Sequence, residues 1–275
     1  SVLGARTNRN GAIMDLLSNI VGKTPLVGLL TEEGRRATWL VEVRTTKLPH
    51  PQLLGAAIGK KVLEGVPFIV GLDRFLGTEL SEETRDYLQD MGAACATYGA
   101  VGLYHVENIT PEAVEQGTDL LIPDHATYVI DDQELQGLLA SYPVLWPSGK
   151  TKPEKCYIGC PHLSLRQLYW WTDRIHNALE ARGQSQLAVE TVLFAAPQVL
   201  QKFKADTEAH KRLQCAGVKL SPACAETLFE GGVSAEDAVV TNSNKLRAYT
   251  TARFFPDEEL VDILVSGEIT DPKGF

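Results

Sequence analysis

The chain has 275 residues, of which 44% are hydrophobic and 22% are charged, a composition typical of a soluble globular protein. Lys and Arg total 26 against 35 Asp and Glu, so the formal net charge is −9. This balance argues against a nucleic-acid-binding protein, because binding to phosphates requires a basic surface. No apolar run approaches the ~18 residues that cross a bilayer, and the first residues lack a signal-peptide pattern. We therefore expect a cytoplasmic protein with no membrane partner.

Short apolar runs alternate with longer segments of helical periodicity, as in α/β proteins. In the first part of the chain the pattern predicts a helix over 11–21, strands over 25–30 and 38–43, a helix over 53–63, a strand over 67–72, a helix capped by Ser81 and ending near 98, a strand over 100–106 and a helix opening at Thr110. After a polar stretch it predicts a strand over 156–159, a helix capped by Ser164 and ending near 181, a strand over 189–194, a helix over 198–214 and strands over 218–220 and 238–241.

Strands separated by helices of this length form parallel, right-handed crossover units. The sequence therefore predicts an α/β fold with layered α/β/α units and largely parallel sheets. The Pro-, Gly- and Lys-bearing stretch over 147–155 predicts the domain boundary. We expect a first unit over residues 1–147 and a second over residues 148–275.

Several polar clusters fall where a predicted strand ends, the edge at which ligands bind in parallel sheets. Cys160 precedes a helix, and the amides of a helix start favour a thiolate that binds metal, but a small buried side chain is the ordinary alternative. Cys156 lies inside its strand and is a weaker candidate. His162 is interpreted as a metal ligand, a proton donor or a cap of its own turn. These alternatives stay open.

Two cationic clusters are candidates for binding a carboxylate, because guanidinium and ammonium groups pair with it. The first is Arg6-Thr7-Asn8-Arg9, and the second is Lys245 with Arg247. A solvated turn is the competing interpretation of each cluster. An odd count of five cysteines is a poor disulfide framework, which leaves metal binding, a nucleophile or core packing for the thiols.

Four ordered blocks of the sequence resemble the large subunit of the aconitase X family. They are the Ser1–Arg9 block, the block from His105 through Thr110-Pro111-Glu112-Ala113, Gly159-Cys160-Pro161-His162-Leu163-Ser164-Leu165, and Thr241-Asn242-Ser243-Asn244-Lys245. The resemblance spans nearly the whole chain. It implies an aconitase-like α/β core and an iron–sulfur cluster or mononuclear iron.

The resemblance also implies a hydro-lyase that dehydrates a small hydroxy acid such as cis-3-hydroxy-L-proline, with phosphomevalonate as the alternative substrate. It assigns Cys160 and Cys224 as metal ligands, and it places His162, Ser243 and Lys245 among the catalytic residues. Arg6, Thr7, Asn8 and Lys245 are the expected substrate-binding residues. The family's N-terminal segment and small swivel subunit are the implied partners.

Because only two credible thiolate ligands lie in the chain, we expect it to assemble the metal incompletely and to be inactive alone. Two rival interpretations from other classes remain. One is a non-catalytic α/β binding or assembly subunit, which metal content distinguishes. The other is a structural zinc protein that uses Cys156, Cys160 and His162.

Overall fold

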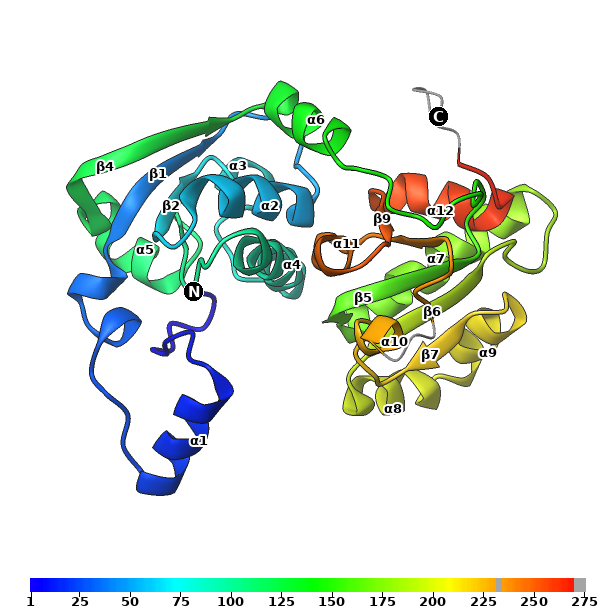
Figure 1. Cartoon of the computed structure of the whole chain (residues 1–275), viewed down its shortest axis with the longest axis horizontal. Helices are drawn as coiled ribbons and strands as arrows, with labels where there is room; N and C mark the ends of the chain where they lie inside the picture. Colours follow the sequence, from blue (N-terminus) through cyan, green and yellow to red (C-terminus); the bar gives the residue numbers. More distant parts are fainter. Residues whose placement is uncertain (231–233, 270–275) are drawn as a thin grey trace. The chain divides into compact units, whose positions relative to one another are not determined.

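The computed structural model describes residues 1–230 and 234–269, which form two compact units, Ser1–Ser141 and Tyr142–Phe275. Figure 1 shows both units, each with strands flanked by helices. The units are described separately below. The domain boundary at residue 147 that the sequence predicts stays a prediction.

The first unit is built on a four-stranded sheet in which every pairing is parallel, with strand order β3-β2-β1-β4. Its strands are β1 (Ala37–Val43), β2 (Pro67–Val70), β3 (His105–Val106) and β4 (Leu121–Ile130). Its helices are α1 (Ala12–Val21), α2 (Pro51–Val62), α3 (Asp73–Leu76), α4 (Glu82–Tyr98), α5 (Pro111–Gln116) and α6 (Asp132–Ala140), with 3-10 turns η1 (Gly28–Leu30), η2 (Glu33–Arg35) and η3 (Gly117–Leu120).

Helices α2 and α4 pack closely against one another in the first unit (Figure 1). Their approach depends on glycine, because a Cβ on Gly55 would lie 2.2 Å from the carbonyl oxygen of Met91. Ser81 begins α4 by accepting a hydrogen bond from the amide of Thr84, as predicted. Helix α1 is different: none of its residues is buried, and Ile13 and Ile20 are more than 70% exposed.

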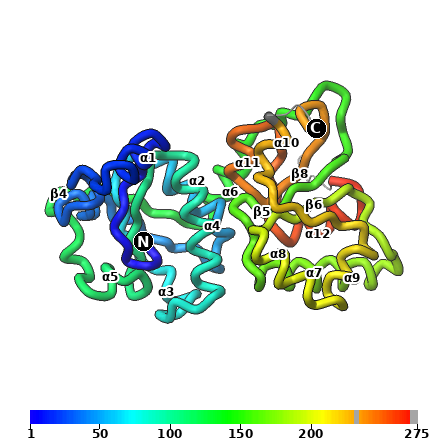
Figure 2. The backbone as a smooth tube through the Cα atoms, turned by 90° about the horizontal axis from the view of Figure 1, so that it is seen from below, coloured from blue at the N-terminus to red at the C-terminus, as the bar shows by residue number. Residues whose placement is uncertain are grey.

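The second unit contains a five-stranded sheet, also parallel throughout, with order β7-β6-β5-β8-β9. Its strands are β5 (Lys155–Leu163), β6 (Glu190–Ala195), β7 (Lys219–Ser221), β8 (Val239–Thr241) and β9 (Arg253–Phe254). The chain moves outward from β5 to β7 and then returns to add β8 on the other side of β5. Figure 2 labels β5, β6 and β8 within this unit. The order reverses between β5 and β8, and such a switch point is where open parallel sheets bind ligands.

Helices cover both faces of the second sheet. They are α7 (Leu165–Ala181), α8 (Pro197–Ala205), α9 (Thr207–Cys215), α10 (Thr227–Glu230), α11 (Asn244–Tyr249) and α12 (Asp257–Ser266). The larger core joins Cys156 and Ile158 to side chains of α7, α8, α9 and α12. A smaller core on the other face joins Tyr157 and Cys160 to Phe194 and to apolar residues around α10 and α11.

Gly159 is the reason that Cys160 belongs to the smaller core. Side chains alternate between the faces of a strand, so Cys160 would otherwise share the face of Ile158. The register with β6 shifts between Ile158 and Leu163, and Gly159 has φ +113° within the shifted segment. A Cβ at Gly159 would lie 2.3 Å from the carbonyl oxygen of Phe194. Only glycine fits both the backbone and the space.

The predicted fold class is confirmed: both units are α/β, with helices flanking wholly parallel sheets. Ser164 starts α7 with a complete capping box to Gln167, which agrees with the predicted N-cap. Within the described residues, no helix combines the length and apolarity that crossing a membrane requires.

Three predicted elements are wrong in detail. The predicted strand over 25–30 is a loop ending in η1, because the Asn8 side chain forms hydrogen bonds with the carbonyl of Val27 and the amide of Leu29. The predicted helix over 198–214 is two helices, because Asp206 leaves the helical conformation and caps α9. The strand predicted over 100–106 pairs only at its end, as β3.

Gly159→Ala should destabilise the second unit by about 1–3 kcal/mol, the usual cost of a non-glycine residue forced into a sparsely populated backbone conformation. It should also displace Cys160. Urea unfolding measures the loss. Gly183→Ala is the matched control, because Gly183 also has positive φ but no atom lies within 4 Å of the added Cβ. Equal effects of the two substitutions would contradict the steric explanation.

Candidate functional site

The ends of β5 and β8 in the second unit place Cys160 and Ser243 side by side. The Ser243 hydroxyl donates to the backbone carbonyl of Cys160 at 2.6 Å and accepts from the amide of Leu246 at 3.0 Å. The second contact caps the start of α11. Ser243 is fully buried, as is Asn244. The hydroxyl therefore ties the α11 start to the end of β5, and its predicted catalytic role stays a prediction.

The thiol of Cys160 lies in an environment with opposing influences. Burial raises its pKa most strongly, the nearby Ser243 side chain and the charge of Lys245 act to lower it, and Cys224 and Glu226 act to raise it. The net pKa is raised. Cys160 is only 8% exposed, whereas Cys224 is exposed. The two thiols, although 64 positions apart in the sequence, are thus close enough to influence one another electrostatically.

Lys245 is half-buried in the same cluster, and its Nζ lies 3.3 Å from Oε2 of Glu226. Burial alone would lower the pKa of Lys245. Electrostatic interactions with Cys160, Glu226 and Cys224, together with the hydrogen bond to Glu226, outweigh that effect, so the pKa is raised. Lys245 is therefore a cation held beside two thiols, as a residue that binds an anion near a metal would be.

His162 connects the end of β5 to the loop that carries Cys224. Its Nε2 lies 3.0 Å from the carbonyl oxygen of Ala223, an acceptor, so this nitrogen is the donor. The contact brings the segment preceding Cys224 to the end of the central strand. The imidazole is partly buried, and its catalytic role stays a prediction.

Cys160 and Cys224 are the side chains of this cluster that could bind iron. Two thiols at a parallel-sheet switch point suit iron or an iron–sulfur cluster, which thiolates bind. Within residues 1–230 and 234–269, however, no group of three His, Cys, Asp or Glu side chains is arranged to hold a metal ion. Cys156 packs in the larger core, away from Cys160. The structure thus lends no support to a zinc site of Cys156, Cys160 and His162.

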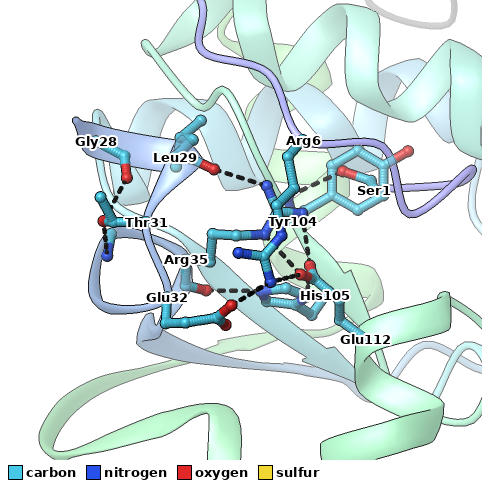
Figure 3. A network of polar contacts seen from close by, with 11 residues as sticks. Ser1, Arg6, Gly28, Leu29, Thr31, Glu32, Arg35, Tyr104, His105 and Glu112 are labelled. Atoms are coloured by element: carbon cyan, nitrogen blue, oxygen red, sulfur yellow. Dashed lines mark hydrogen bonds and ion pairs between the residues drawn. The ribbon is translucent and has the colours of Figure 1, made fainter. Parts of the chain in front are cut away.

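The first unit contains a separate network of charged groups around Glu112 (Figure 3). The guanidinium of Arg35, only 2% exposed, donates to both carboxylate oxygens of Glu112 at 2.6 Å. His105 is also buried, donates through Nε2 to the carbonyl of Arg35 at 2.9 Å and lies 3.7 Å from Glu112 through Nδ1. Glu112 lies in the first turn of α5, where the helix dipole favours a carboxylate.

The pKa shifts in this network follow from those contacts. The hydrogen bonds from Arg35 are the main reason that the pKa of Glu112 is lowered. Burial is the main reason that the pKa of His105 is lowered. Glu112 is therefore ionised and paired with Arg35. This pairing makes Glu112 a poor proton acceptor, and it fixes the surrounding loops.

The predicted substrate-binding residues of the Ser1–Arg9 block border this network. The Arg6 guanidinium is 40% exposed and lies 2.6 Å from Glu32 and 3.9 Å from Glu112. The amide of Asn8 donates to Val27 and accepts from Leu29, while the Thr7 hydroxyl donates to the carbonyl of Asn8. Asn8 and Thr7 therefore shape the loop in the observed state. Contact of these residues with a substrate stays a prediction.

Arg35 and Glu226 are the residues of these two clusters that sequence reasoning missed. Arg35 lies in the Gly34-Arg35-Arg36 turn before β1, and an arginine in a turn is ordinarily solvated. Its burial depends on the distant Glu112, which no local pattern reveals. Glu226 had a weak local signal, since it lies two residues after Cys224.

Glu112→Gln should lower the free energy of unfolding at pH 7 by about 3 kcal/mol, because it leaves the Arg35 charge buried without its ionic partner. The lowered pKa of Glu112 means that its stabilisation is complete above the pKa of an unfolded glutamate and is lost as the pH falls through the folded value. The lowered pKa of His105 acts in the same direction, since the unfolded chain takes up the proton first.

Chemical denaturation between pH 7 and pH 3 measures both effects. The variant should lose less stability over the acid range than the unchanged protein does. Glu115→Gln, on an exposed position of the same helix, is the control. A variant as stable as this control at pH 7 would contradict the anchoring role of Glu112.

Comparison with known proteins agrees with this geometry. Residues 37–140 match the family model described as the aconitase X second domain. The crystal structure of Thermococcus kodakaraensis aconitase X in its holo-form superimposes with a TM-score of 0.77 at 27% identity, covering 97% of this chain and 64% of that chain.

Similar sequences are named as dehydratases. The phosphomevalonate dehydratase large subunit of Thermococcus kodakarensis is 36% identical over 186 residues, which are 67% of this chain and 43% of that protein. The Methanosarcina mazei large subunit of the same name is 29% identical over 90% of this chain and 56% of its own length.

The cis-3-hydroxy-L-proline dehydratase of Pseudomonas aeruginosa is 34% identical over 41% of this chain and 19% of its own length. The chain thus spans about half the length of the large subunits that it matches. The matched fold, the family model and these relatives together show that the chain belongs to the aconitase X family.

Proposed function

We propose that the chain forms the core of a hydro-lyase that removes water from a small hydroxy acid. The observation that carries the proposal is the grouping of two thiols with the Lys245 ammonium at the β5–β8 switch point. The names of the dehydratase relatives support the same class of reaction. A non-catalytic assembly subunit would have no need for a half-buried cation beside two thiols.

Cys160 and Cys224 are the residues proposed to hold iron, either mononuclear or in a cluster. When bound, the iron supplies a Lewis acid for the departing hydroxyl group. Lys245 binds the substrate carboxylate and stabilises the charge that develops on it as the adjacent proton leaves. His162 holds the two thiol-bearing segments together through its contact with Ala223, and Ser243 holds the start of α11 against Cys160.

The substrate is proposed to be cis-3-hydroxy-L-proline or phosphomevalonate. Both carry the carboxylate that Lys245 would bind. The phosphomevalonate enzymes match a larger share of this chain, 61–90% against 41%, and this observation favours the second candidate. A dehydration assay with each compound distinguishes them.

A small subunit is the proposed protein partner, since the phosphomevalonate relatives are named large subunits. We also propose that the third metal ligand and the catalytic base lie outside this 275-residue chain. The isolated chain should then bind iron incompletely and fail to dehydrate either compound. Full turnover by the isolated chain would contradict this division of the site.

Anaerobic loading with iron, followed by desalting and iron analysis, tests the metal site directly. Cys160→Ser and Cys224→Ser should each lower iron affinity by more than about tenfold, because even outer-shell changes cost 10–100-fold. Cys215→Ser is the matched control, since Cys215 is exposed at the end of α9 and precedes β7, whereas Cys224 follows that strand. Iron retention by both site variants would contradict the proposal and favour the non-catalytic alternative.

A further inference from the structure

Glu226 is placed to restrict what Lys245 can bind. Its Oε2 lies 3.3 Å from the Lys245 ammonium, and the two side chains are 24% and 36% exposed. The carboxylate comes from the loop just after Cys224, whereas the ammonium comes from the first turn of α11. The cation that would hold a substrate anion is therefore already paired with an anion of its own chain.

Partial burial makes the electrostatic interaction of this pair stronger than that of an ion pair at the surface. Two charges separated by a few ångströms interact more strongly as water is excluded, because the effective dielectric constant falls. An incoming anion must either displace Glu226 from the ammonium or share the ammonium with it. Repulsion from Glu226 opposes binding in both cases.

We propose that Glu226 is a specificity-determining residue that competes with ligand anions for the Lys245 ammonium. This inference deepens the proposed function and rests on the assignment of Lys245 as the anion-binding residue. A simple anion contacts the site only through Lys245, so the competition keeps its affinity low. A hydroxy acid has a second anchor in its hydroxyl group, and this extra contact offsets the competition from Glu226.

A purely structural ion pair is the alternative. In that case Glu226 and Lys245 would only join the Cys224 loop to α11, and anions would bind equally weakly with or without the carboxylate. The two roles predict opposite results when the charge of Glu226 is removed but its shape is kept.

The test uses the full 275-residue chain without metal and inorganic phosphate or acetate as the probe, titrated by calorimetry at low ionic strength. Glu226→Gln should bind both anions about tenfold more tightly than the unchanged chain, because the competing charge is gone. Adding Lys245→Gln to this variant should abolish the gain. Glu226→Asp keeps the charge and should bind the anions as weakly as the unchanged chain.

Glu190→Gln is the matched control, because it removes the same charge from an ion pair with Lys219 at the opposite end of the strands. Near-ultraviolet circular dichroism shows whether each variant is folded. Unchanged or weaker anion binding by folded Glu226→Gln would overturn the inference, and so would an equal gain in Glu190→Gln. If Glu226→Gln itself does not fold, Glu226→Ala also removes the charge: a tenfold gain in anion affinity supports the inference, and unchanged or weaker binding overturns it.

The outcome is distinguishable from that of the proposed function. A tenfold gain in anion affinity without iron binding or dehydration would leave the role of Glu226 intact and remove the hydro-lyase. Iron binding through Cys160 and Cys224 without any gain in anion affinity would support the proposed function and overturn the role of Glu226.

Discussion

The close approach of Gly159 to the carbonyl group of Phe194 is the constraint on which the second unit's candidate site depends. A parallel sheet buried on both faces sends alternate side chains into two cores. The register shift at Gly159 interrupts this alternation and moves Cys160 to the face that carries the Cys224 loop and α11. Without it, the thiol would face the larger core beside Cys156, on the opposite face of the sheet from the smaller core.

The topology then determines which other residues join Cys160. Because β8 returns to the side of β5 opposite β6, the Ser243 turn lies directly beside the end of β5. The loop bearing Cys224 follows β7 and reaches the same place through the His162–Ala223 contact. Three segments from distant parts of the sequence therefore supply thiols, a cation and a carboxylate. In the first unit the loops around Arg6 are instead fixed by an ion pair between Arg35 and Glu112.

Sequence reasoning succeeded where the signal is local. The caps at Ser81 and Ser164 and the buried strand beginning at Pro67 each follow from a few neighbouring residues. The strand predicted over 156–159 instead continues through Cys160 to Leu163. It missed β4, of whose ten residues only Ile130 is buried and which gives no alternating apolar pattern. It also missed the partnerships of Arg35 with Glu112 and of Lys245 with Glu226, since these depend on which loops the sheet order brings together. A resemblance between motifs located Cys224, but no spacing rule connects it to Cys160.

The central claim is that the β5–β8 switch point gathers Cys160 and Cys224 around a shared iron centre. The most direct measurement is a crystal structure of the anaerobically iron-loaded protein, with anomalous scattering data collected at the iron edge. The account predicts an iron peak within bonding distance of both sulfur atoms and close to the Lys245 side chain. An iron peak bound elsewhere, with the two thiols remaining free, would contradict it.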